Sequence, residues 1–204
     1  LVAAHPVYGI KVNPVGCQSP ALELLHAGVP LLDFAEAHDL PILFHATTLP
    51  GEDYSQAADI FEIVEKRPGL RFCLAHCLMF SREWLARAQI ASNVWVDTAA
   101  MKIQVDSIRP LIGNPYPAAL FLDADFSDHV KVMRTICESF PDTMLWGTDS
   151  PAYSWICRRK EGDGIYREFK LKGQYADEIR ALQALPPALR AKVSNENTLD
   201  FVFG

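Results

Sequence analysis

The chain has 204 residues, half of them hydrophobic and 22% charged, and its 19 basic and 25 acidic side chains give a net charge of -6. This composition excludes a wholly disordered chain, and the acidic balance argues against a general nucleic-acid binder. No apolar run approaches the roughly 20 residues that cross a bilayer, which argues against a membrane partner.

The cysteines and the N-terminus bear on the setting of the protein. Five cysteines, an odd number with no Cys-x-x-Cys pair, argue against a disulfide framework and against a thiolate zinc site. No basic segment precedes the apolar N-terminal residues, as it would in a signal peptide. We therefore expect a cytoplasmic protein that forms one domain over residues 1–204.

Short β-rich apolar runs alternate with longer segments of helical periodicity along the chain. Strands are predicted over residues 7–12, 41–45, 70–76, 94–98 and 143–147. Helices are predicted over 22–38 (broken or restarted at Pro30), 56–66, 81–91 (with Ser81 as N-cap), 128–140, 174–184, 187–192 and 195–202. Irregular structure is expected over 101–126, and a polar, charged connection over 151–173.

Five alternating strand–helix units are the signature of a parallel α/β sheet. Both the open doubly wound sheet and the eight-stranded (β/α)8 barrel of the TIM type are built this way. The chain contains neither Gly-x-Gly-x-x-Gly nor Gly-x4-Gly-Lys-Ser/Thr, so no nucleotide-binding turn supports the open sheet.

Polar residues fall at the ends of several predicted strands. The second strand ends in His45, the third in His76, the fourth carries Asp97, and the fifth runs into Asp149. The carboxyl ends of parallel strands meet at one face, and imidazole nitrogens with a carboxylate oxygen suit Zn²⁺, Fe²⁺ or Mn²⁺. Such an ion lowers the pKa of bound water to roughly 7, and a neighbouring Asp can take the proton. Structural histidines and an ordinary turn around Asp149 are the alternative interpretation.

Five short motifs, in this order, resemble the amidohydrolase superfamily. They lie at residues 9–14 (GIKVNP), 41–45 (PILFH), 74–77 (LAHC), 145–151 (LWGTDSP) and 197–204 (NTLDFVFG). The chain is most similar to the branch of metal-dependent TIM-barrel hydrolases and decarboxylases that act on small carboxylated or aromatic compounds. The resemblance implies that residues 1–204 correspond to strands four to eight of the barrel.

The resemblance also implies roles for individual residues. His45 matches a metal ligand at the end of strand five. His76 matches the strand-six histidine, which binds a second metal or orients water and polarises the substrate. Asp149 matches the strand-eight residue that binds metal and acts as general base. Lys11 lies where some branches carry a carboxylated, metal-bridging lysine, although a substrate contact is the expected role here. Further substrate contacts are expected from three residues, Thr47, Ser150 and Tyr153.

The implied function is a metal-dependent hydrolase or decarboxylase of a small organic acid, lactone or amide. Metal-activated water and Asp149 as general base would perform the reaction, with zinc as the expected ion and manganese or iron as alternatives.

One departure from the superfamily is large. Its His-x-His pair on strand one, which supplies two metal ligands, is absent from this sequence, and the chain begins at Leu1 rather than at Met. We therefore expect a fragment that lacks an N-terminal segment, or strands supplied by another polypeptide, or a homo-oligomer that covers the open sheet edges.

Two other functions stay open at this point. A TatD-type metal-dependent DNase also has barrel strands that end in His and a Thr-Asp-Ser-Pro turn, but it needs a Glu where this chain has Lys11. A catalytically inactive barrel fragment that serves as a binding or scaffold subunit is the non-enzymatic alternative.

Overall fold

The computed structural model describes residues 6–150, 156–160, 164–170 and 173–204. Within these residues one parallel sheet has five strands in sequential order, β1-β2-β3-β4-β5. The strands are β1 (Ile10–Val12), β2 (Ile42–Phe44), β3 (Phe72–Leu74), β4 (Val94–Asp97) and β5 (Met144–Leu145). Each strand follows its neighbour after a helical crossover, so the five predicted strand–helix units are confirmed.

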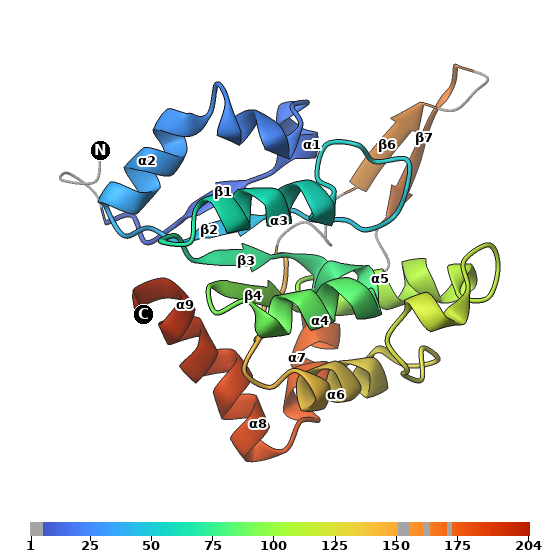
Figure 1. The fold of residues 1–204 in the computed structure, drawn as a ribbon. Coiled ribbons are helices and arrows are strands. Elements are labelled where there is room, and N and C mark those ends of the chain that lie inside the picture. The colour runs from blue at the N-terminus through green and yellow to red at the C-terminus, as the bar shows by residue number, and fades with distance from the viewer. Residues whose placement is uncertain (1–5, 151–155, 161–163, 171–172) are drawn as a thin grey trace.

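Helices connect these strands and follow the last of them (Figure 1). Helices of the first four units are α1 (Pro14–Cys17), α2 (Val29–Ala37), α3 (Ala57–Lys66), α4 (Arg82–Ile90), α5 (Met101–Ile108) and α6 (His129–Ser139). The C-terminal helices are α7 (Tyr175–Gln183), α8 (Pro187–Ala191), the π-helical segment η6 (Lys192–Glu196) and α9 (Asn197–Phe203). Short 3-10 segments are η1 (Ala21–Leu25), η2 (His76–Phe80), η3 (Arg109–Leu111) and η4 (Ala118–Leu120). None of the described helices is both long and apolar enough to cross a membrane.

The two faces of the sheet are covered differently. One face forms the main core, in which Phe44 and Phe72 stack at 6.2 Å and helices α3 and α6 add buried side chains such as Phe61 and Ile136. On the opposite face, Cys73 and Leu145 pack against Phe201 of α9. Burial of apolar area of this kind is the main stabilising contribution to such a fold.

Arg71, next to β3, fixes helix α9 against the sheet. Its guanidinium donates hydrogen bonds to the carbonyl oxygens of Phe201 (2.8 Å) and Gly204 (2.5 Å), and it pairs with Asp39 at 2.7 Å. Carbonyl groups at the end of a helix lack partners within the helix. A cation at this position therefore satisfies them and holds the C-terminal helix in place.

Two predictions of local structure were wrong. Residues 101–126 are not irregular throughout, because α5 occupies 101–108 with Met101, Val105 and Ile108 buried. Their i, i+4, i+7 spacing is helical, whereas the prolines at 110, 115 and 117 favour irregular structure only in the residues that follow the helix. The predicted connection over 151–173 contains an antiparallel hairpin of β6 (Ile156–Lys160) and β7 (Tyr166–Lys170), which projects from one end of the molecule (Figure 1).

Two smaller expectations had different outcomes. Helix α2 begins at Val29 with Pro30 in its first turn, which confirms that the proline restarts the helix. Ser81 does occupy the N-cap position of α4, but its side chain makes no capping hydrogen bond.

Candidate active site

Two histidines meet at the carboxyl ends of neighbouring strands. His45 directly follows β2, and His76 lies two residues after β3. Nδ1 of His45 is 2.9 Å from Nε2 of His76, and Nδ1 of His76 is 3.1 Å from the carbonyl oxygen of Ala99. A carbonyl only accepts, so Nδ1 of His76 is the donor there, and in the neutral ring Nε2 accepts from the Nδ1–H of His45. This tautomer gives Nε2 of His45 the lone pair that a ligand or metal could use.

His45 is held in its neutral form. Burial, in the first place, and then the electrostatic influence of His76 and Lys11 lower its pKa from 6.5 to about 4, while Glu52 acts in the opposite direction. A neutral imidazole is the form that coordinates metal ions.

Asp97, at the end of β4, fixes the backbone around His76. Its side chain is buried, and Oδ1 accepts hydrogen bonds from the backbone N–H of His76 (2.9 Å) and of Ala99 (3.0 Å). The thiol of Cys73 lies 3.9 Å from the other carboxylate oxygen. One carboxylate thus positions both His76 and the residue whose carbonyl orients its ring. Asp97 was predicted to lie at a strand end, but this positioning role was not predicted from the sequence.

Asp149 follows β5 and the Gly147–Thr148 dipeptide. Its φ of 58° is left-handed, a conformation that Asp tolerates better than most residues. Burial raises the pKa of its carboxyl group, the charges of His76 and Lys11 lower it, and that of Asp97 raises it. These influences indicate that Asp149 lies within electrostatic range of His76. A carboxylate with a raised pKa is better matched to proton transfer near neutral pH than an exposed one.

The predicted substrate contacts have separate positions. Lys11 is exposed on β1, acts electrostatically on His45 and Asp149, and lines a cavity of about 380 Å³ together with residues 12–31 of the following turns and helices. Thr47 is buried and accepts a hydrogen bond from the N–H of Leu49 at 3.2 Å, while Ser150 is exposed. Tyr153 lies outside the described residues. A substrate contact by any of the four stays a prediction.

His76 begins a left-handed turn that the sequence analysis did not predict. Residues His76 to Phe80 have φ values of 66°, 54°, 48°, 51° and 59°, and none of them is glycine. Each left-handed L-residue costs roughly 1–2 kcal/mol. Burial of His76, Cys77, Leu78 and Phe80, with the hydrogen bond from His76 to Asp97, opposes that cost. Strained backbone of this kind clusters at functional sites.

We expect Cys77→Val to be strongly destabilising, because a β-branched side chain is the least compatible with φ of 54°. Cys137→Val is the matched control, since Cys137 is equally buried but lies within the right-handed helix α6. The Cys77 variant should lose about 2 kcal/mol more free energy of unfolding than the control in urea titrations. Equal losses in the two variants would show that the left-handed turn is not strained.

The comparisons with known proteins bear on this arrangement. Residues 2–203 match the sequence model of the family described as Amidohydrolase. The chain belongs to the amidohydrolase family. No curated protein matches this amidohydrolase chain. Among solved structures, it is similar to a dihydroorotase from Campylobacter jejuni (15% identity, TM-score 0.56, 95% of this chain and 58% of that one). It is also similar to a 2,6-dihydroxybenzoate decarboxylase from Rhizobium (13% identity, TM-score 0.55, 98% of this chain and 64% of that one).

These likenesses establish the architecture of the amidohydrolase chain. They confirm the expected α/β fold of the TIM-barrel type, represented here by five consecutive strand–helix units. The chain spans 58% and 64% of the two solved structures, less than two thirds of either.

Amidohydrolases usually bind divalent metal ions. The donor chemistry suits such an ion at two of the three residues, because Nε2 of His45 has a free lone pair and the carboxylate of Asp149 lies in electrostatic reach of His76. Both ring nitrogens of His76 are hydrogen-bonded, so its Nε2 would have to exchange the hydrogen bond from His45 for the ion. In the described part of the chain, however, no group of three or more His, Cys, Asp or Glu side chains is arranged to hold a metal. His45, His76 and Asp149 thus stay a predicted ligand set.

Proposed function

We propose that this amidohydrolase chain forms the catalytic part of a metal-dependent hydrolase or decarboxylase that acts on a small organic acid, lactone or amide. The observation that carries the proposal is the convergence of His45 and His76, with ring nitrogens 2.9 Å apart at neighbouring strand ends. In TIM barrels this end of the strands holds the active site. Two solved neighbours, with TM-scores of 0.55 and 0.51, are named as decarboxylases of 2,6-dihydroxybenzoate and 5-carboxyvanillate, which supports a small carboxylated substrate.

In this proposal a divalent ion, zinc in the first place and manganese or iron as alternatives, would be held by His45, His76 and Asp149. When bound, it would supply Lewis-acid chemistry, polarising a carbonyl and lowering the pKa of water. Further ligands would come from polypeptide outside these 204 residues or from a second copy of the chain. The reducing setting suggested by the odd number of cysteines supports a cytoplasmic location.

The residues of the chain itself have three tasks. Asp149 would accept a proton at a carboxylate oxygen, for which its raised pKa suits it. His76, fixed through Asp97 and Ala99, would orient the reacting group by hydrogen bonding. Lys11 would bind a substrate carboxylate, because its positive charge acts on both His45 and Asp149 and its side chain lines a cavity on the same strand.

The experiment that tests this proposal measures the metal content of the protein and its catalytic turnover. The protein is stripped with a chelator, reloaded with zinc, manganese or iron, and tested on aromatic carboxylates, lactones and amides for carbon dioxide release or hydrolysis. We expect about one ion per chain and turnover that requires it, both lost in His45→Ala. His38→Ala is the control, because His38 ends helix α2, where its ring lies 4.5 Å from Phe34. Equal metal binding in both variants, or no metal-dependent turnover, would favour a scaffold role.

A further inference from the structure

The turn between β4 and α5 holds the acceptor that orients His76. Ala99 lies in this turn, and its carbonyl accepts the Nδ1–H of His76 at 3.1 Å. Its own N–H is bonded to Asp97 at 3.0 Å. Ala100 follows in a left-handed conformation with φ of 57°. The direction of the Ala99 carbonyl therefore depends on how both sides of this short turn are fixed.

Helix α5 begins without a capping residue of its own. Its N-cap residue is Ala100, which has no polar side chain. The first N–H groups of a helix have no partner within the helix and are costly when buried. Here they are bonded to Glu178 of helix α7, whose carboxylate oxygens accept from Met101 N–H at 3.1 Å and from Lys102 N–H at 3.3 Å. Glu178 is 2% exposed.

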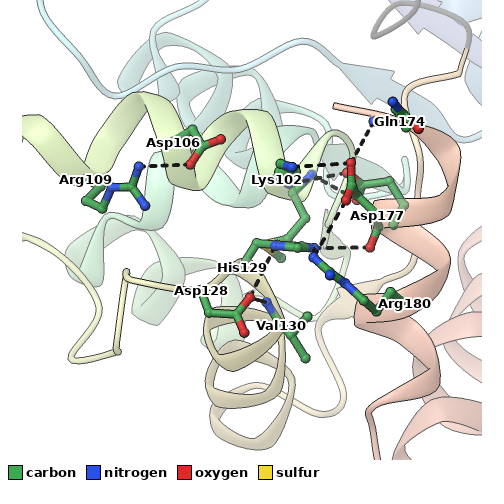
Figure 2. A network of polar contacts seen from close by, with 11 residues as sticks. Lys102, Asp106, Arg109, Asp128, His129, Val130, Gln174, Asp177 and Arg180 are labelled. Carbon is green, nitrogen blue, oxygen red and sulfur yellow. Dashed lines mark hydrogen bonds and ion pairs between the residues drawn. The ribbon is translucent and has the colours of Figure 1, made fainter. Parts of the chain in front are cut away.

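The charged groups around Glu178 engage one another. Lys102 of α5 pairs with Asp177 at 3.5 Å, and Arg180 of α7 lies 3.6 Å from Asp177 and 3.4 Å from Nε2 of His129 of α6 (Figure 2). Among the described residues, the carboxylate of Glu178 takes part in none of these ion pairs and is bonded to the two backbone N–H groups of α5. The partial positive charge of a helix N-terminus favours this placement.

Electrostatics connect Glu178 with the candidate active site. Its pKa is raised from 4.5 to about 7, because burial and the charges of Asp177 and Asp149 together outweigh the two backbone hydrogen bonds, which lower it. Asp149 is therefore close enough to act on Glu178, although the two residues belong to different elements. Glu178 was not singled out in the sequence analysis.

We propose that Glu178 is a positioning residue for His76: by holding the first turn of α5 it fixes the Ala99 carbonyl that orients the imidazole. The chain of contacts runs from Glu178 through the N–H groups of Met101 and Lys102 to the turn at Ala99 and then to Nδ1 of His76. The catalytic consequence rests on the proposed function, whereas the effect on the ring of His76 does not.

The test compares Glu178→Ala and Glu178→Gln with Asp177→Asn as the matched control. Alanine removes both acceptors of α5, while glutamine keeps one oxygen. Asp177 is adjacent on α7 and pairs with the side chain of Lys102, but it accepts no hydrogen bond from the backbone of α5. The first readout is the Nδ1–H resonance of His76 in ¹⁵N-histidine-labelled, metal-free protein. We expect it to shift and to exchange faster in Glu178→Ala, less so in Glu178→Gln, and to stay unchanged in Asp177→Asn.

The second readout is kinetic. If His76 acts in turnover, Glu178→Ala should lower kcat about tenfold with KM within twofold, in the range typical for residues that orient a ligand or catalytic group. An unchanged His76 resonance in folded Glu178→Ala, or an equal change in Asp177→Asn, would overturn the proposal. If Glu178→Ala does not fold, the Nδ1–H resonance of His76 in Glu178→Gln, compared with that in Asp177→Asn, decides instead. A shifted resonance in a protein without turnover would instead reject the proposed function and leave the positioning role standing.

Discussion

Asp149→Asn is expected to lower kcat about a thousandfold, within the range for loss of a general base. Asparagine has the same shape as aspartate and also tolerates the left-handed φ of 58° at this position, so the backbone should be unchanged. The amide cannot accept a proton as the carboxylate does. Kinetics at saturating metal would separate this effect from weaker metal binding, and the acidic limb of the pH–rate profile should disappear.

Asp142→Asn is the control for this substitution. Its side chain is 82% exposed and pairs with Lys192 at the surface, remote in the fold from the histidine pair. An exposed ion pair of this kind contributes little to stability. We expect kcat to be unchanged in this variant. A loss of kcat smaller than about threefold in Asp149→Asn would exclude Asp149 as the general base.

The second large effect is a pair of opposite pH dependences in the metal-free protein. His45 has a pKa lowered from 6.5 to about 4, so between these values the unfolded chain binds a proton that the folded chain does not. Stability from this group is complete above pH 6.5 and is lost as the pH falls toward 4. Glu178 has a pKa raised from 4.5 to about 7, so here the folded chain binds the extra proton. Its contribution is complete below pH 4.5 and is lost as the pH rises through 7.

The two contributions oppose each other between pH 4.5 and 6.5 and should partly cancel in the wild type. Each is worth at most about 1.4 kcal/mol per pH unit, or about 3 kcal/mol over this window, and less for the partly exposed His45. Relative to the wild type, Glu178→Gln should therefore gain stability with rising pH, and His45→Asn should lose it. Urea unfolding at intervals of half a pH unit measures both slopes. Parallel curves for the two variants would contradict the assignment.

The order of the strand–helix units and the meeting of the two histidines could both be predicted from the sequence. The strands are short apolar runs, and residues that follow neighbouring parallel strands at equivalent positions lie close together. Phe44 pairs with Leu74, so His76 lies one position beyond the residue that is level with His45, and the topology brings the two histidines to the same end of the sheet. Their 2.9 Å contact also depends on the left-handed turn that begins at His76. The hydrophobic pattern of the sequence was therefore sufficient to predict that His45 and His76 approach each other, because this approach depends only on two adjacent strands.

Other features depend on contacts that no local pattern announces. Glu178 caps a helix that begins 77 residues earlier, and nothing in the residues around it distinguishes it from a surface glutamate of α7. The left-handed turn after His76 contains no glycine, so the usual signal for positive φ is missing. The hairpin of β6 and β7 is rich in charged residues, so hydrophobic alternation predicted no strands there.

The ends of the parallel sheet have a practical consequence for handling the isolated chain. In the described residues β1 and β5 each pair with a strand on one side only, and unpaired strand edges can template association between molecules. Their lengths of three and two residues, with the charged Lys11 in β1, limit that tendency. We therefore expect self-association that grows with protein concentration rather than immediate precipitation. Dilute samples, or co-expression with a polypeptide that pairs with these edges, should give the better-behaved preparation.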